Sequence, residues 1–178
     1  MEDFTQINTR NKSHVTIDEV QVVEFILGEE KFAINLFDVR EIVESFRITP
    51  LPHAPSYVKG IIDLRGEITT VIDLKTILRI IPKNSEGQID ARFIVLDERV
   101  TNVKTGILVD DVTSVLTIPV TDIDKTSYEG EESAYILGII KKTIGDRDDT
   151  KKELLIWIDI KALLKGTEVE TGNKKNRE

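Results

Sequence analysis

Short apolar runs recur along most of the chain and are separated by Gly, Pro or charged residues. Such runs, rich in Val and Ile and closely spaced, are typical of antiparallel β-sandwiches and barrels. Strands are predicted at 20–27, 31–34, 61–64, 68–74, 92–96, 106–109, 115–118, 135–140 and 154–158. No long stripe with a period of 3.6 residues is present, so short helices are predicted only at 36–40, 74–78 and 160–164. We therefore predict an all-β fold with a few short helices.

The two halves of the chain carry a weak internal repeat. Segments 60–62 and 71–78 are matched, in the same order, by segments 138–140 and 157–164. Further upstream, 25–27 and 38–43 are echoed by 94–96 and 111–116. Two similar β units are therefore expected, and they can exchange strands with each other. Chance similarity between segments rich in Ile and Val is the competing explanation.

The composition is that of a globular protein. Of 178 residues, 40% are hydrophobic and 31% are charged, which suits one domain or two small lobes that share an interface. The folded part is expected at 18–167, with a flexible N-terminal tail at 1–17 and a polar C-terminal tail at 168–178.

Cysteine usage and charge exclude several classes of function. The chain has no cysteine, which rules out thiolate nucleophiles, sulfur-based zinc sites and disulfides. With no leader-like start and no apolar run of membrane-spanning length, we expect a cytoplasmic protein that does not insert into the membrane. The net charge of −8 argues against nucleic acid as a partner.

No credible active site emerges from the reactive residues. His14 lies in the N-terminal tail and His53 in a proline-rich loop, so neither is an obvious base or metal ligand. Asp63 and Asp73 are able to face each other across a hairpin as a carboxylate pair. The simpler interpretation of Asp73, and of Asp159 in the second repeat, is a cap at the start of a helical turn. No glycine-rich phosphate loop is present.

One long segment resembles a known family. Residues 57–74 read YVKGIIDLRGEITTVIDL and are similar to the central motif V-x-G-V-I-N-L-R-G-x-I-V-P-V-I-D-L of CheW-type chemotaxis coupling proteins. Blocks at 25–34, 39–42, 106–112 and 135–139 also resemble the family, in the expected order, so that the likeness covers about 20–165. The chain departs from the motif at three positions, namely Asp63 for Asn, Thr70 for Pro and Asp111 for Gly. These departures bear on partner specificity rather than on the fold.

The resemblance implies two five-stranded SH3-like β-barrel subdomains packed together, with a groove between them. It implies a non-enzymatic adaptor, without cofactor or metal, that couples transmembrane chemoreceptors to the histidine kinase CheA in a ternary complex controlling kinase activity. The partners would be the regulatory domain of CheA and the cytoplasmic tip of a methyl-accepting chemoreceptor. The protein would be recruited to membrane-associated receptor arrays.

The same resemblance assigns contact residues. Receptor binding is expected at Val39, Glu41, Gly60, Arg65, Gly106, Val112 and Val115. Kinase binding is expected at Lys59 and Ile68. From the residues alone, Arg65 is an ordinary turn charge at a hairpin tip and Val39 suits a core as well as an interface. With the motif in place, Arg65 is expected to face a partner or to pair with Glu41.

Two other functions stay open from the sequence. A small-ligand-binding β-barrel would use Trp157, Phe93 and Tyr135 to line a cavity, although aromatic residues near strands are more often core. A hydrolase would use the carboxylates of Asp63 and Asp73.

Overall fold

The computed structural model describes residues 18–44, 47–81, 91–125, 134–145 and 151–172, and within 168–172 it describes the backbone alone. The N-terminal tail predicted at 1–17 lies outside the described residues. In the described part, no helix is both long enough and apolar enough to span a bilayer.

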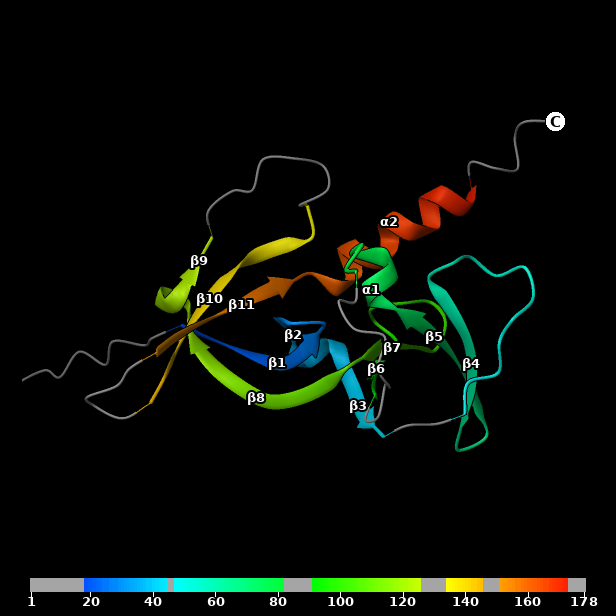
Figure 1. The fold of residues 1–178 in the computed structure, drawn as a ribbon, viewed down its shortest axis with the longest axis horizontal. Coiled ribbons are helices and arrows are strands. Elements are labelled where there is room, and N and C mark those ends of the chain that lie inside the picture. Colours follow the sequence, from blue (N-terminus) through cyan, green and yellow to red (C-terminus); the bar gives the residue numbers. More distant parts are fainter. Residues whose placement is uncertain (1–17, 45–46, 82–90, 126–133, 146–150, 173–178) are drawn as a thin grey trace, which may run out of the picture.

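The strands form two sheets, which Figure 1 shows as two lobes side by side. The larger sheet has six strands in the order β8-β1-β2-β11-β10-β9. Their bounds are β1 Glu19–Leu27, β2 Glu30–Asn35, β8 Asp111–Pro119, β9 Ile123–Asp124, β10 Ile136–Ile144 and β11 Lys151–Ile158. We call this part of the molecule the six-stranded lobe.

The second sheet has five strands in the order β3-β6-β7-β5-β4. Their bounds are β3 Val39–Val43, β4 Val58–Leu64, β5 Glu67–Asp73, β6 Arg92–Leu96 and β7 Thr105–Val109. The helices are α1 Leu74–Ile77, α2 Ile160–Gly172 and the 3-10 turns Leu36–Asp38 and Val120–Asp122. This five-stranded lobe carries α1, and α2 follows the last strand of the other lobe; both helices lie near the junction of the lobes (Figure 1).

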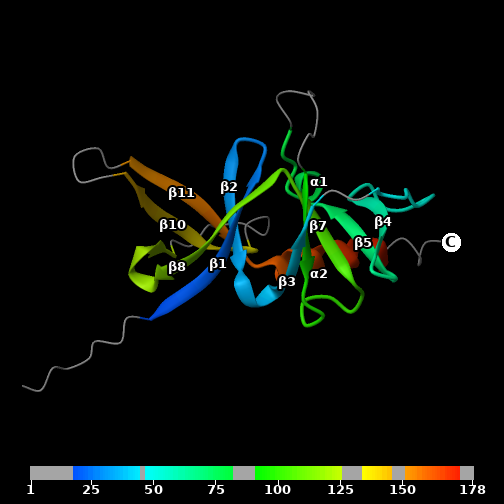
Figure 2. The ribbon, with the colours of Figure 1, turned by 90° about the horizontal axis from the view of Figure 1, so that it is seen from below.

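The five-stranded lobe is inserted in sequence between the strands of the six-stranded lobe. Strands β1 and β2 belong to the larger sheet, the chain crosses to β3 through the turn Leu36–Asp38, and it crosses back between β7 and β8 at Asp110. Figure 2 shows β8 running from the six-stranded lobe toward β7 of the other lobe. In the middle of the larger sheet β2 pairs in parallel with β11, and the smaller sheet contains the matching parallel pair β5 and β7.

The structure contains the internal repeat that the sequence indicates. The units β4-β5-α1 and β10-β11-α2 have the same hairpin, with an irregular register just before Gly60 in one and Gly138 in the other. In each unit an aspartate then caps the helix: the Asp73 carboxylate accepts the Lys75 N–H at 2.9 Å, and the Asp159 carboxylate accepts the Ala162 N–H at 2.9 Å. Each half also gives strands to both sheets, so the repeated units exchange strands.

The buried apolar side chains form three clusters. The largest lies between the lobes and combines residues of β1, β2, β5, β6, β7 and both helices, among them Phe25, Ile94 and Leu163. We call it the interlobe core. A second cluster around Trp157 fills the six-stranded lobe, and a third around Phe93 fills the five-stranded lobe. Because burial of apolar surface is the main favourable contribution to folding, the interlobe core stabilises the packing of the two lobes on each other.

The predicted all-β class and the two packed barrel subdomains are confirmed, and three details differ. One lobe has six strands rather than five, because the two-residue strand β9 is added at the edge of the sheet, next to β10. The helix predicted at 36–40 ends at Asp38, and Val39 begins a strand that pairs with β6. Helix α2 continues to Gly172, so the polar tail predicted from residue 168 begins inside a helix.

Candidate functional site

The tip of the β4–β5 hairpin is a two-residue turn. Arg65 and Gly66 both have positive φ angles, 56° and 84°, which match the right-handed twist of the strands they join. The Asp63 carboxylate accepts the Gly66 N–H at 2.7 Å and fixes the turn. Arg65 is thereby held out from the lobe, with 78% of its side chain exposed.

This tip is tied to β3, at the opposite edge of the same sheet, by ion pairs. The Arg65 guanidinium lies 3.2 Å from the Glu41 carboxylate, which confirms the predicted pairing. Next to it, Arg40 lies 3.9 Å from Glu67 at the base of the turn, and Lys104 also pairs with Glu67. The hydrogen bond and charge of Lys104, with a smaller contribution from Arg40, lower the pKa of Glu67. These ion pairs therefore connect β3 to the β4–β5 hairpin, although β3 forms no backbone hydrogen bonds with β4 or β5 in the sheet.

Val39 and Val112 approach the interlobe core from different lobes. Val39 is half-buried on β3, opposite Leu96 of β6, and Val112 is half-buried on β8, opposite Phe25 of β1. Both valines pack against the interlobe core. Val115, three residues further along β8, is 54% exposed. The valines predicted to bind the receptor thus lie along both lobes rather than on one strand.

The two residues predicted to bind the kinase lie on the β4–β5 hairpin. The Lys59 ammonium is 3.1 Å from the Asp73 carboxylate at the base of the hairpin. Ile68 pairs with Asp63 near the tip and is 59% exposed. The hairpin therefore offers an exposed apolar side chain between charged groups.

The two glycines predicted at the receptor site are inside the five-stranded lobe. Gly60 is buried with φ 147°, and a Cβ atom there would lie 2.2 Å from the Thr49 carbonyl oxygen. Gly106 is buried on β7, between Val71 of β5 and Val95 of β6. Neither offers a side chain to a partner, and of the two only Gly60 is a position where an added Cβ atom would clash with the backbone.

The carboxylate pair considered for a hydrolase does not form. Asp63 is opposite Ile68, whereas Asp73 is five residues further along β5, a separation of about 17 Å at the rise of a strand. Asp63 is engaged in the turn, and Asp73 caps α1 and pairs with Lys59. Among the residues that the structure describes, no group of three or more His, Asp or Glu side chains is placed to hold a metal ion.

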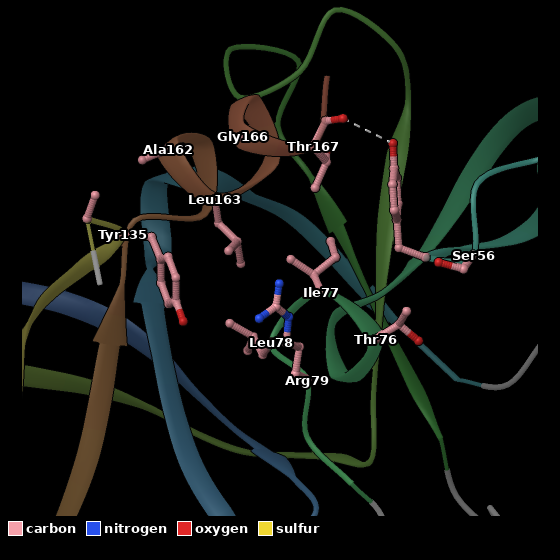
Figure 3. A pocket seen from close by; sticks show the side chains of 12 residues that line it. Ser56, Thr76, Ile77, Leu78, Arg79, Tyr135, Ala162, Leu163, Gly166 and Thr167 are labelled. Carbon is pink, nitrogen blue, oxygen red and sulfur yellow. Dashed lines mark hydrogen bonds between the residues drawn. The ribbon is translucent and has the colours of Figure 1, made fainter. Parts of the chain in front are cut away.

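The three aromatic residues considered for a ligand cavity are also apart. Trp157 and Phe93 are buried in the separate cores of the two lobes. Tyr135 alone of the three lines a cavity, which lies between α1 and α2 (Figure 3). Its other wall residues, such as Tyr57 and Arg79, were not anticipated, because nothing local in the sequence indicates that the two helices meet.

Comparison with known proteins adds an independent line of evidence. Residues 21–168 match the family model of the CheW-like domain. The chain is 34% identical over 118 residues to the chemotaxis protein CheW of Rhizobium meliloti, covering 66% of this chain and 74% of the relative. It is 31% identical over 160 residues to the chemotaxis protein CheW of Treponema pallidum, covering 88% of each. In structure it resembles the crystal structure of the scaffolding protein TtCheW from Thermoanaerobacter tengcongensis, with a TM-score of 0.66, 30% identity, and coverage of 84% of this chain and 90% of that one.

Proposed function

The chain belongs to the CheW-like domain family, and on that basis we propose that it is a non-catalytic adaptor that couples chemoreceptors to the histidine kinase CheA. In this role it holds the cytoplasmic tip of a receptor and the regulatory domain of the kinase in one ternary complex. The complex forms in the cytoplasm, at membrane-associated receptor arrays, and controls the activity of the kinase.

One observation carries the proposal. Three of the residues at which the family motif places the two contacts, Glu41, Arg65 and Ile68, are at least partly exposed and lie at or near the tip of the β4–β5 hairpin. Glu41 and Arg65 form an ion pair there, and Ile68 follows three residues later with most of its side chain in solvent. Receptor and kinase would then bind neighbouring surfaces, with the receptor surface extending from the five-stranded lobe onto β8 of the six-stranded lobe.

This arrangement suits the coupling of two partners. The Glu41–Arg65 pair connects the hairpin to β3, so the proposed receptor surface and the hairpin that faces the kinase are in direct contact. Val39 and Val112 provide the apolar part of the receptor surface, on which the apolar face of a helix can pack. Each contact is small, and many copies in an array multiply weak affinities through avidity.

Replacement of Arg65 by alanine tests the receptor surface. An ion pair with one partner 78% exposed contributes about 0–1 kcal/mol to folding, so the thermal midpoint of Arg65→Ala should change little. Coupling should fall strongly, because the variant loses the cation that faces the receptor and the connection between the hairpin and β3. The measurement is receptor-stimulated autophosphorylation of CheA in a reconstituted ternary complex.

Lys141→Ala is the matched control for this experiment. Lys141 is 51% exposed and pairs with Asp124 on the six-stranded lobe, away from the hairpin. The Lys141→Ala substitution removes a positive charge, as Arg65→Ala does, and should leave coupling intact. Normal coupling by Arg65→Ala would refute this placement of the receptor surface.

The kinase surface is tested at Ile68. Because its side chain is 59% exposed, Ile68→Ala should fold normally and yet weaken binding to the CheA regulatory domain by about tenfold, through loss of one apolar anchor. Leu154→Ala changes a side chain of the same exposure, 59%, on the six-stranded lobe and should bind as the unchanged protein does. Isothermal titration calorimetry with the isolated regulatory domain measures both. Equal losses for the two variants would contradict a kinase surface on the hairpin.

A further inference from the structure

The side chain of Asp110 connects the two lobes. Asp110 is the single residue between β7 of the five-stranded lobe and β8 of the six-stranded lobe. One of its carboxylate oxygens accepts the N–H of Gly28, in the turn between β1 and β2, at 2.6 Å, and the other accepts a hydrogen bond from the Lys75 ammonium of α1, also at 2.6 Å. The turn belongs to the six-stranded lobe and α1 to the five-stranded lobe, so one carboxylate binds both. We call these two contacts the Asp110 bridge.

Further contacts hold the surroundings of the Asp110 bridge together. The Asp110 N–H donates to the Ile26 carbonyl of β1 at 3.0 Å. A Cβ atom added at Gly28 would lie 3.3 Å from the Ile80 side chain, so the turn between β1 and β2 packs directly against the residues that follow α1. The turn, the crossover from β7 to β8 and the end of α1 therefore meet at one point.

The Asp110 bridge is largely shielded from solvent. The Lys75 side chain is 15% exposed and the Asp110 side chain 28%. Salt screens a partly buried ion pair less than an exposed one, and charge-assisted hydrogen bonds require short distances and near-linear geometry. Loss of one partner also leaves the other charge partly buried and unpaired. The bridge therefore tolerates little displacement of the two elements that it joins.

The interlobe core does not supply this precision by itself. Its contacts are apolar, and the attraction between apolar surfaces depends on the area they bury and has no preferred direction. Packed elements of proteins do slide past one another in small shear movements. A hydrogen-bonded ion pair fixes both a distance and an angle, so it selects one orientation of the lobes among those that the core permits.

The orientation of the lobes matters for the receptor surface proposed above. That surface includes Val39 on β3 of the five-stranded lobe and Val112 on β8 of the six-stranded lobe. Val112 is two residues from Asp110 in sequence, and both valines pack against the interlobe core. A rotation of one lobe on the other would change how the two valines are placed relative to each other. The hairpin that carries Ile68 lies wholly within the five-stranded lobe and would keep its shape.

We propose that Asp110 is a positioning residue: the Asp110 bridge sets the orientation of the lobes and thereby aligns Val39 with Val112 for the receptor tip. Asp110 acts through the packing of the lobes rather than through contact with the receptor. The alignment of the receptor surface rests on the adaptor function proposed above, whereas the orientation of the lobes is a property of the protein alone.

Residual dipolar couplings of the backbone amides measure the orientation of the lobes in the absence of any partner. In the unchanged protein, one alignment tensor should fit the amides of both lobes in the orientation that the structure shows. In Asp110→Ala, the couplings within each lobe should still fit that lobe, while the two lobes require different tensors. Asp110→Asn keeps an acceptor for the Gly28 N–H and should show a smaller change. Lys75→Met removes the ion pair alone and should resemble Asp110→Asn.

Asp97 provides the matched control. Its side chain is 29% exposed, close to the 28% of Asp110. Its carboxylate likewise accepts a backbone N–H, at 3.0 Å, and a cationic side chain, at 2.6 Å, but both groups belong to Arg99 in the same loop of the five-stranded lobe. Asp97→Ala should therefore leave one tensor for both lobes. One shared tensor in Asp110→Ala, or an equal change in Asp97→Ala, would refute the role given to the Asp110 bridge.

Binding to the two partners tests the alignment of the receptor surface. Asp110→Ala should weaken binding to a receptor cytoplasmic fragment about fivefold to tenfold and leave binding to the isolated CheA regulatory domain unchanged. Equal losses for both partners, or reoriented lobes with normal receptor binding, would refute the positioning role and leave the adaptor role in place. If Asp110→Ala does not give a native circular dichroism spectrum, Asp110→Asn and Lys75→Met take its place in both experiments.

Failure of the adaptor proposal would be seen separately. An unchanged protein that binds neither partner would refute the adaptor role and with it the receptor surface. The residual dipolar couplings would still decide whether Asp110 fixes the orientation of the lobes, because they need neither receptor nor kinase.

Discussion

Gly60→Ala is expected to lower the free energy of unfolding by on the order of 3 kcal/mol or more, or to prevent folding. The added Cβ would lie 2.2 Å from the carbonyl oxygen of Thr49, a backbone atom that cannot move aside alone. Thr49 is itself fixed, because it exchanges two hydrogen bonds with Ile61, of 2.8 and 2.9 Å. The φ of 147° adds strain for any residue other than glycine. Chemical denaturation followed by circular dichroism measures the loss.

Other glycines of the chain provide graded controls. At Gly66 an added Cβ meets nothing within 4 Å, so Gly66→Ala should cost only the strain of its positive φ, about 1 kcal/mol. At Gly138, the equivalent of Gly60 in the second repeat, the Cβ would lie 2.8 Å from the Asp124 carbonyl oxygen, and an intermediate loss is expected. Coupling to the kinase should fall with the folded fraction of Gly60→Ala. A fully folded Gly60→Ala that fails to couple would instead assign this glycine to a direct contact.

Lys142→Met is expected to destabilise the protein by about 2–3 kcal/mol at pH 7, because it leaves a buried carboxylate short of its main partner. The Glu24 side chain is fully buried on β1. One of its carboxylate oxygens lies 2.7 Å from the Lys142 ammonium and 2.7 Å from the Ser114 hydroxyl, and the other lies 3.5 Å from the Lys31 ammonium. Lys142 is 26% exposed, which reduces the effect below that of a fully buried pair. Urea denaturation of both proteins gives the difference.

The dependence of stability on pH tests whether the Glu24 carboxylate causes the loss of stability in Lys142→Met. Burial raises the pKa of Glu24, but the hydrogen bonds from Lys142 and Ser114 and the charges of Lys142 and Lys31 outweigh it and hold the pKa below its ordinary value of 4.5. A depressed pKa in the folded state means that the stabilisation is complete above pH 4.5 and is lost as the pH falls through the folded value. The difference in the free energy of unfolding between Lys142→Met and the unchanged protein should therefore disappear at acidic pH, where Glu24 is protonated.

Lys141, the residue next to Lys142, provides the control substitution. Lys141→Met removes a cation that is 51% exposed and pairs with the partly exposed Asp124, and it should change stability by less than about 1 kcal/mol at any pH. A similar loss for the two variants, or a gap for Lys142→Met that persists in acid, would contradict the role given to Glu24.

The sequence predicts most of the strands because their apolar runs are short, rich in Ile and Val, and bounded by turns. It also predicts the capping of α1 and α2 by Asp73 and Asp159, since that pattern is local. Strand β3 is missed because it follows the turn Leu36–Asp38 directly, and its pairing with β6 depends on residues far along the chain. The end of α2 is misplaced because Gly166 is a typical helix-ending residue, yet the helix continues past it.

The surface features are harder to predict than the strands. Family motifs bring Glu41 and Arg65 together correctly, but they do not distinguish an exposed contact from a buried glycine such as Gly106. Glu24 is a single charge within an apolar run, and its partners come from three other strands. The cavity between α1 and α2 depends on the packing of segments that are distant in sequence. Tertiary contacts, rather than local preference, decide all of these.

The insertion of one lobe inside the other sets an order for biosynthesis. Strands β1 and β2 are translated before the five-stranded lobe, whereas their neighbours β8 and β11 are translated only after it. The nascent chain therefore carries an apolar hairpin with two open edges while the inserted lobe is being made, a state prone to aggregation. The interval ends only when β8 has been translated and can pair with β1.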